Sequence, residues 1–396
     1  MEKSFKESFS ALKSYCESQD FAGWDPYDGL NSAIFKATPL KKWPVARLAW
    51  IQLFKRSPVN LRRLLFVPKA HNPKGLGLFL SGYCNLYHLC SKNGRSDFGT
   101  GDEILERIET LIKLIMQLRS EGYSGDCWGY NFDWQAKAFF QPSGTPTVVA
   151  TTFIGSALLD AFEITGDKNL LLSARSSCDF ILKDLNRTFD DKGNFAFSYS
   201  PLDKTAVFNA SLLGSRLLSR VYHFTGEKIL IDEARKSVEF CCSYQRPDGS
   251  WGYGTLDFHQ WIDNFHTGYN LECISAYSKY SGDNGFNENI EKGFSYYIST
   301  FFTPEGIAKY YNNELYPVDI HAPAQLVITL ARMGRFNAYR ETAAKVLGWT
   351  IRHMQSESGY FFYQKRRYST SRIPFMRWAQ AWMFYALSEY LLQSVE

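Results

Sequence analysis

Two histidines and an arginine stand out as residues whose chemistry could act on a substrate. His266, His321 and Arg377 each fall where an apolar helical pattern begins, after a loop rich in aromatic and polar residues. Imidazole groups remove and return protons near neutral pH, and a guanidinium stabilises negative charge developing on oxygen. Carboxylates in the same loops could instead serve hydrolysis, which needs two of them. The candidate catalytic residues are His266, His321, Asp133, Asp263, Asp319 and Arg377.

The loops around these residues mix indole, amide and carboxylate groups. Most of them belong to the stretches GWDPYDGLN, CWGYNFDWQ, WIDNFHTGY, YPVDIHAPAQ and FMRWAQAWM. A sugar site needs this mixture, because aromatic faces stack on sugar rings while planar polar groups bind hydroxyls. The candidate substrate-binding residues are Trp24, Asp25, Asp28, Asn31, Trp128, Asn131, Trp134, Gln135, Asn209, Asn264, Gln325, Trp378 and Gln380.

These residues also have structural interpretations. Asp263 and Asp319 could cap helices, and the two histidines could be hydrogen-bonded core residues. The basic run at 365–367 could be a solvated loop. What favours a site is that carboxylate, imidazole, amide and indole groups all recur at one kind of position, the start of an apolar helix.

Two alternating series of glycines show how the chain would bring these loops together. Glycines that follow Thr or Ser and precede an acidic residue end apolar helical runs, as C-terminal caps do; these are Gly101, Gly166, Gly226 and Gly282, with Gly334 as a degenerate fifth. Between them, other glycines lead into aromatic residues: Gly125, Gly193, Gly249, Gly306 and Gly359. Each repeat therefore holds two helices.

The helices of a repeat differ in kind, since one is amphipathic and the next is apolar on most sides. The predicted outer and inner pairs are 43–56 with 74–91, 102–119 with 146–164, 168–185 with 206–224, 228–244 with 264–280, 285–301 with 319–333, and 336–354 with 376–393. An open solenoid needs polar end caps, but the last inner helix is as apolar as the middle ones. We therefore predict an all-α (α/α)6 toroid over residues 41–396, covered by residues 1–40 as an extra segment.

In this arrangement all the long aromatic loops lie at one end of the toroid. The inner helices begin at the same end, and their free N–H groups and dipoles favour anionic groups there. The sequence thus predicts one funnel that contains the candidate residues.

Composition narrows the possible partners. The net charge of +4 gives no reason to expect a nucleic-acid partner. The N-terminal residues carry charges every few positions, and no run of 18 apolar residues occurs, so neither an export signal nor a membrane-spanning helix is expected. We expect a cytoplasmic protein whose eight cysteines are reduced core thiols. No motif for a metal or a nucleotide cofactor is present, so neither is expected.

The quoted stretches also carry resemblances. QRPDGSWGYG resembles a turn of terpenoid cyclases and related α/α toroids, but the D-x-D-D acid of those cyclases is absent. The stretches given above, with NRTFDDKGNFAFSYSPLD, together resemble a poorly characterised family of bacterial and archaeal surface-polysaccharide biosynthesis proteins. That resemblance implies a glycan-related biosynthetic setting, with an oligosaccharide, polysaccharide or lipid-linked glycan as substrate and polysaccharide-assembly enzymes as possible associates.

Three functions follow. The first is a sugar epimerase or isomerase with His266 and His321 as acid and base and Arg377 as the electrostatic group, by analogy with the N-acylglucosamine two-epimerases. The second is a glycoside hydrolase using a pair among Asp133, Asp263 and Asp319, or a lyase using Tyr or His with Arg. The third is a glycan-binding component without catalysis.

Overall fold

The computed structural model describes residues 4–93, 97–136 and 140–395. Its centre is a closed ring of helices, in which each packs against the next and the last against the first. These inner helices are α4 (Pro73–Asn93), α6 (Val148–Thr165), α8 (Phe208–Thr225), α10 (Asn264–Ser281), α12 (His321–Arg332) and α14 (Trp382–Gln393). The predicted all-α toroid is confirmed.

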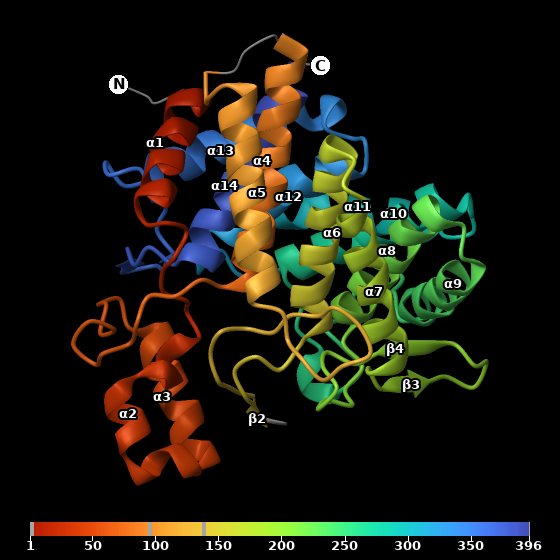
Figure 1. Cartoon of the computed structure of the whole chain (residues 1–396), viewed down its shortest axis with the longest axis horizontal. Coiled ribbons are helices and arrows are strands. Elements are labelled where there is room, and N and C mark those ends of the chain that lie inside the picture. The colour runs from red at the N-terminus through yellow and green to blue at the C-terminus, as the bar shows by residue number, and fades with distance from the viewer. Residues whose placement is uncertain (1–3, 94–96, 137–139, 396) are drawn as a thin grey trace.

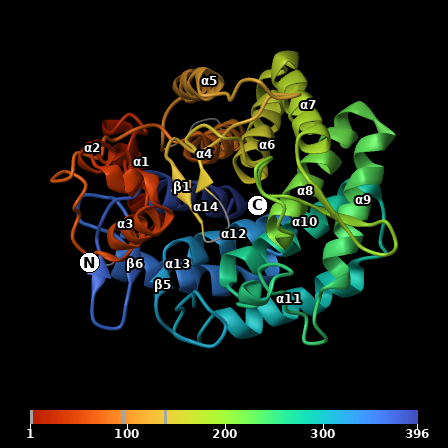
Figure 2. The same cartoon turned by 90° about the horizontal axis from the view of Figure 1, so that it is seen from below.

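The ring closes where α4 meets α14. A Cβ at Gly82 of α4 would lie 2.5 Å from the ring of Phe384, so only a glycine allows this close approach. Figure 2 looks along the toroid and shows the inner helices surrounded by an outer layer.

Five of the six predicted outer helices lie in the outer layer. They are α5 (Gly101–Gln117), α7 (Lys168–Lys183), α9 (Lys228–Ser243), α11 (Asn287–Phe301) and α13 (Arg340–Met354). Each packs mainly against the inner helix before it in the chain and not against the following one with which it was predicted to pair. Their amphipathic patterns explain the position, because one face is buried on the inner ring and the other meets solvent.

The first predicted pair was wrong. The sixth outer position is taken by α1 (Phe5–Ser18), which packs against α14, and not by residues 43–56. Phe9 and Leu12 of α1 are completely buried, and Phe9 contacts the rings of Phe98 and Phe384. In contrast, α3 (Pro44–Arg56) buries only Ile51 and Phe54. A helix with so narrow a buried face cannot fill a gap in the outer layer.

Residues between α1 and α4 therefore form the longest outer-to-inner connection. It contains η1 (Asp28–Asn31), α2 (Ala33–Ala37), η2 (Pro39–Lys42) and α3. Figure 1 shows this segment projecting from the toroid at the lower left, on the side of the aromatic loops. The division of the chain at residue 40 into a covering segment and a toroid stays a prediction.

The predicted glycine caps are confirmed for three inner helices. Gly166, Gly226 and Gly282 adopt φ of 69°, 71° and 77° and end α6, α8 and α10. Gly101 does not have this role, because it is the first residue of α5 after the N-cap Thr100. Glycine is needed at the three caps because side chains disfavour the left-handed region.

Short antiparallel strands stiffen the aromatic loops. They are β1 (Trp134–Gln135) with β2 (Phe140–Gln141), β3 (Arg187–Phe189) with β4 (Phe195–Phe197), and the sheet β5 (Val318–Asp319), β6 (Gln364–Lys365) and β7 (Thr370–Ser371). Because β5 precedes α12 and β6 precedes η5 (Met376–Ala381), this sheet links two neighbouring funnel loops.

Two further features concern the core. All eight cysteines are buried and unpaired, as expected of core thiols. Within the described ranges, α6 alone is long and apolar enough to cross a membrane, and 67% of it is buried. The apolar character of α6 matches its place in the inner ring.

Candidate active site

A cavity of about 670 Å³ opens at the end of the toroid where the inner helices begin. Its walls combine residues from the aromatic loops with residues at or near the starts of α4, α6, α8, α10 and α12. This volume is in the range of ligand sites in enzymes. The predicted gathering of the loops around one funnel is confirmed.

Seven of the predicted residues line this cavity. They are His266, His321 and Arg377 among the catalytic candidates, and Trp134, Gln135, Asn209 and Trp378 among the binding candidates. The Oδ1 atom of Asn209 is buried and has no hydrogen-bond partner among the described residues. Asn209 thus lines the cavity with one side-chain acceptor that the described residues leave unpaired.

His321 lies deep in the funnel and is neutral. Its Nε2 is 2.8 Å from the Tyr269 hydroxyl, while its buried Nδ1 has no hydrogen-bond partner in the described chain. The ring stacks on Phe265 at 4.3 Å and lies 4.1 Å from Trp382. Burial, and then the positive charge of Lys74, hold the pKa of His321 well below its usual value. A neutral imidazole held in one orientation is suited to act as a base.

His266 is oriented by a carboxylate. Asp263 caps α10 by accepting the His266 backbone N–H at 2.9 Å through Oδ1. Its other oxygen is 2.9 Å from Nδ1 of the same histidine. Asp263 therefore caps the helix, as its structural interpretation from the sequence predicted. The same side chain also fixes the orientation of the imidazole that lines the cavity.

Arg377 is held by the N-terminal loop. Its Nε and Nη2 donate to the two carboxylate oxygens of Asp25 at 2.6 and 2.8 Å. Asp28 lies behind this pair and binds Arg62 at 2.7 Å. Arg377 belongs to a π-helical turn, η5 (Met376–Ala381), a conformation found often at functional sites. Asp25 and Asp28 thus position the cation and are not themselves in the cavity wall.

Asp319 supports the site from behind. It is completely buried and accepts hydrogen bonds from the His321 N–H, Trp378 Nε1 and Gln364 Nε2 at 3.0, 2.9 and 2.9 Å. Burial raises the pKa of Asp319 from 3.8 to about 6, and the hydrogen bonds offset part of this rise. Asp319 holds Trp378 and the start of α12 in place.

The raised pKa predicts a pH-dependent stability difference. Between pH 3.8 and about 6 the native carboxyl binds more protons than the unfolded one, so ionisation of Asp319 lowers the free energy of unfolding as pH rises. Asp319→Asn lacks this loss, which amounts to about 3 kcal/mol. Both proteins would be unfolded in urea at pH 4 and at pH 8. The free energy of unfolding of Asp319→Asn, relative to that of the wild type, should be higher at pH 8 than at pH 4. Asp28, whose pKa is also raised to about 6, is common to both and cancels. An unchanged difference would contradict the prediction.

The remaining predicted residues lie outside the cavity wall and contact protein. The indoles of Trp24 and Trp128 donate to the carbonyls of Val67 and Ile115, Asn31 donates to the carbonyl of Asn131, and the Asn131 side chain accepts from Asn72. Asp133 accepts from the Ser143 N–H, Asn264 accepts from the Tyr297 hydroxyl, and Gln325 donates to Thr329. Gln380 accepts from the backbone N–H of Phe361 and donates to its carbonyl. Their positions in loops or helix starts match the pattern, but the tertiary contacts commit their side chains to structural roles.

Lys74 is the principal residue that sequence reasoning missed. It follows the first residue of α4, lines the cavity, and is only 4% exposed. Its Nζ lies 4.3 Å from the Phe153 ring, 5.2 Å from Trp382 and 5.7 Å from Tyr269. Burial, followed by Arg377 and Arg216, holds the pKa of Lys74 well below its usual value. A charged residue at an apolar helix start was the signal that identified Arg377, and it applies equally to Lys74.

Aromatic residues make up most of the remaining wall. Tyr27, Tyr130, Phe132, Tyr199, Tyr253, Phe258, Trp261, Phe265, Tyr269, Tyr310 and Tyr311 line the cavity. Tyr253 and Trp261 are stacked at 4.4 Å. Such walls stack on sugar rings, and their phenol groups can bind hydroxyls.

Carboxylates are scarce in the wall. Among the described lining residues Asp203 is the one carboxylate, and both of its oxygens accept hydrogen bonds from Thr205. Over the same ranges no group of three or more His, Cys, Asp and Glu could hold a metal ion.

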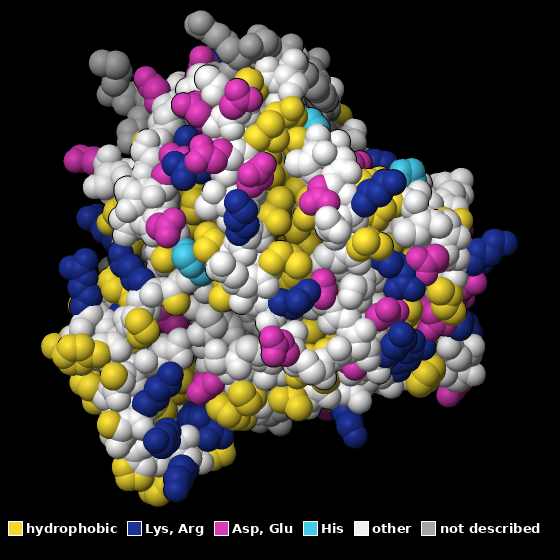
Figure 3. Space-filling model, in the orientation of Figure 1, with side chains coloured by type: hydrophobic (Ala, Val, Ile, Leu, Met, Phe, Trp, Pro, Cys, Tyr) yellow, Lys and Arg dark blue, Asp and Glu magenta, His cyan; other side chains and the backbone are white. Residues whose placement is uncertain are grey.

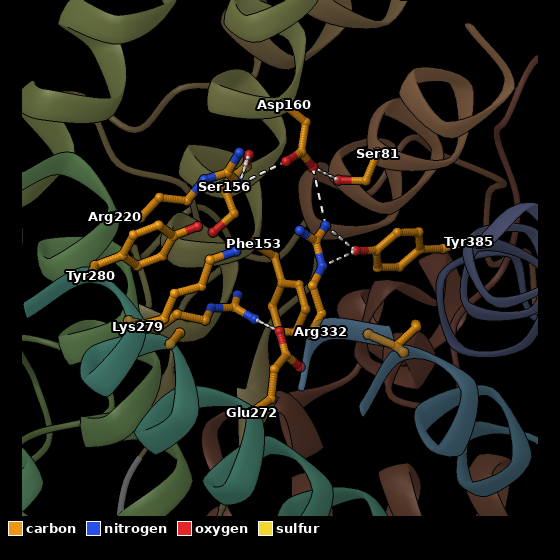
Figure 4. A pocket seen from close by; sticks show the side chains of 13 residues that line it. Ser81, Phe153, Ser156, Asp160, Arg220, Glu272, Lys279, Tyr280, Arg332 and Tyr385 are labelled. Carbon is orange, nitrogen blue, oxygen red and sulfur yellow. Dashed lines mark hydrogen bonds and ion pairs between the residues drawn. The ribbon is translucent and has the colours of Figure 1, made fainter. Parts of the chain in front are cut away.

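A second, smaller cavity lies toward the other end of the barrel. It has a volume of about 60 Å³, and Arg216, Arg220 and Arg332 meet Glu272 and Asp160 there (Figure 4). Asp160 accepts from Arg220 at 2.7 Å and from Ser81 at 2.8 Å. This paired network fills the barrel beneath the floor of the funnel.

The fold is an (α/α)6 toroid with its large cavity at the end where the inner helices begin. Similar solved structures include a sugar epimerase from a ruminal bacterium, at 14% identity over 82% of this chain and 88% of that one, with a TM-score of 0.61. A GH76 α-mannanase from Bacteroides thetaiotaomicron is 10% identical over the same shares, with a TM-score of 0.63. An unsaturated glucuronyl hydrolase specific for heparin is 14% identical over 99% and 97%, with a TM-score of 0.61.

At these identities the likeness shows the fold alone. No family model and no curated protein matches the chain, so the resemblance to surface-polysaccharide biosynthesis proteins stays a prediction.

Proposed function

We propose that the chain is a carbohydrate-active enzyme that moves a proton at a sugar carbon next to a carbonyl or carboxylate group, as an epimerase or isomerase does. The observation that carries this proposal is the composition of the cavity wall. It holds the two oriented histidines His266 and His321 and four basic residues, Lys55, Arg56, Lys74 and Arg377, but only one carboxylate among the described lining residues.

In the proposed reaction one imidazole acts as the base. His321 takes the proton from the sugar carbon, the C–H electron pair forms a C=C bond, the π pair of the neighbouring C=O moves onto its oxygen, and Arg377 and Lys74 stabilise the oxyanion. His266, oriented by Asp263, returns a proton to the opposite face of the carbon, and the electron pair re-forms the carbonyl. The similar structures support this class in part, since one of them is a sugar epimerase.

The hydrolase alternative is less well supported. Hydrolysis needs two carboxylates on either side of the bond. Asp263 and Asp319 lie behind the wall, Asp133 accepts a backbone N–H from Ser143, and Asp203 is bonded to Thr205. A lyase is favoured over a hydrolase by the contact of Tyr269 with His321, because a lyase pairs Tyr or His with a cation. A non-catalytic glycan-binding component would not need the oriented histidines.

The biological setting is part of the same proposal. An enzyme of surface-polysaccharide biosynthesis would act in the cytoplasm on an oligosaccharide, polysaccharide or lipid-linked glycan, beside other assembly enzymes. These assignments follow from the sequence resemblance.

Deuterium uptake tests the chemistry directly. Reducing sugars, uronates and the glycan of the neighbouring biosynthetic genes would be incubated with the protein in heavy water. We expect one deuterium at the epimerised carbon, seen by mass spectrometry and NMR. New reducing ends without deuterium would indicate a hydrolase, and a product absorbing in the ultraviolet would indicate a lyase. Glycan binding without turnover across the panel would favour the non-catalytic alternative.

A further inference from the structure

The segment that projects from the toroid is basic throughout. Residues 29–69 contain no Asp or Glu, and their cationic residues are Lys36, Lys41, Lys42, Arg47, Lys55, Arg56, Arg62, Arg63 and Lys69. Arg62 alone is fully buried, where it binds Asp28. The rest leave an excess of positive charge on the segment that no acidic residue within it offsets.

The same segment exposes large apolar side chains. Trp43, Val45, Leu53, Leu64 and Phe66 are 62%, 80%, 48%, 71% and 67% exposed. In α3, Val45 and Leu53 are two steps of four apart, so they lie on one face of the helix. Figure 3 shows hydrophobic and basic side chains interspersed over this projection. Isolated exposed apolar residues are ordinary, but a cluster of this kind marks an interaction surface.

Phe66 adds a conformational observation. Its φ is 51°, in the left-handed region that bulky residues rarely adopt. Its backbone carbonyl accepts from Ala33, which ties the loop to α2. The loop that is tied to α2 in this way carries an exposed aromatic ring.

The β6–β7 hairpin extends this surface. It carries Lys365, Arg366, Arg367 and Arg372 without any acidic residue over 365–372, and Tyr368 at its tip is 90% exposed. Arg366 Nη1 donates to the carbonyl of Arg56 at 2.8 Å, which joins the hairpin to the end of α3. The basic run noted in the sequence therefore belongs to the same face.

We propose that this face docks on an anionic lipid bilayer. Basic residues alternating with exposed Trp, Phe, Leu and Val are what an interfacial segment needs: the apolar groups enter the headgroup region while the cations meet anionic lipids. A nucleic acid would not explain the exposed aliphatic residues. A second copy of the chain would bring two acid-free faces together, and their charges repel.

The docking face borders the mouth of the funnel. An adjoining face of α3, with Leu48, Gln52 and Lys55, lines the cavity. A bilayer held by Val45 and Leu53 thus lies next to the opening. If the proposed function is correct, the substrate is a glycan presented at the membrane surface, as a lipid-linked glycan is. The docking itself does not depend on that function.

Flotation with lipid vesicles tests the docking without any sugar. Full-length protein would be mixed with vesicles of phosphatidylcholine alone or with roughly one third phosphatidylglycerol. We expect it to float with the anionic vesicles and to bind neutral ones at least ~10-fold less. Val45→Ser with Leu53→Ser should reduce flotation ~10-fold, and Lys41→Glu with Lys42→Glu should do the same. Leu172→Ser with Ile229→Ser, at residues 63% and 55% exposed on α7 and α9, is the matched control and should bind normally.

Several results would overturn the proposal. The wild-type protein could remain with the unbound fraction, or the Val45 and Leu53 variant could float as well as the control. Duplex DNA could compete for the face, or light scattering could show a dimer that the same variant dissociates. Because all three double variants change exposed residues, circular dichroism should show unaltered folding. Flotation without any sugar turnover would leave the docking intact and refute only the enzymatic proposal.

Discussion

Replacing His321 with glutamine is expected to lower the rate of deuterium exchange into the sugar about 10³-fold, with little change in substrate binding. General base catalysis contributes roughly 10² to 10⁴ in rate, and glutamine keeps the shape and hydrogen-bonding capacity of the ring but cannot accept the proton. Burial and Lys74 lower the pKa of the His321 imidazole, which favours the unprotonated form that a base needs. The measurement is single-turnover exchange in heavy water, with KM determined in parallel.

The control for this experiment is His88→Gln. His88 is exposed on α4 and lies outside the cavity wall, so its replacement should leave exchange unchanged. His266→Gln should also lower the rate of deuterium exchange. In the proposed reaction His321 acts on one face of the sugar carbon and His266 on the opposite face, so each single variant affects proton transfer on a different face. Wild-type exchange in His321→Gln would remove this residue as the base.

Replacing Lys74 with methionine is expected to make the protein more stable and less active. Lys74 Nζ has aromatic rings on three sides, and among the described residues no hydrogen bond or ion pair to it is found. Methionine is of similar length and apolar, so the variant should gain about 1–3 kcal/mol in free energy of unfolding at pH 7. Loss of one electrostatic group at an oxyanion lowers kcat/KM about 10²-fold.

The stability gain should depend on pH with a definite sign. Burial lowers the pKa of Lys74, and the positive charges of Arg377 and Arg216 lower it further, while Asp25 opposes them. The unfolded chain therefore binds more protons than the native one up to the usual lysine pKa of about 10.5, and wild-type stability rises with pH in that window.

The two lysine variants separate charge from packing. Lys74→Met lacks the rise in stability with pH, so its advantage over the wild type should shrink toward pH 10. Lys74→Arg keeps a permanent charge and should retain more activity while being less stable than Lys74→Met. Urea unfolding from pH 6 to 10, with kcat and KM at pH 7, measures both effects. Equal stability of the wild type and Lys74→Met at every pH would show that the ammonium group is not desolvated.

The placement of Lys74 and Arg377 shows how far sequence reasoning reached. Both are charged residues at the start of an apolar inner helix, so the pattern could have identified both, yet it was applied only to Arg377. The carboxylates were harder, because Asp263 and Asp319 have the same local context whether they face the substrate or the protein. Their hydrogen bonds to His266 and Trp378 depend on groups brought near by tertiary packing.

The sequence by itself determined the toroid, because helix period, amphipathicity and glycine caps are local properties that repeat along the chain. It also determined which loops would meet, since closure of the ring gathers all outer-to-inner connections at one end. The tertiary structure alone decided that α1 and not α3 closes the outer layer. Both segments are short amphipathic helices, and only the fit of Phe9 and Leu12 between distant parts of the chain selects one of them. Because α1 occupies the sixth outer position, α3 lies at the rim of the funnel instead. Both placements depend on which segment packs better against residues distant in the sequence.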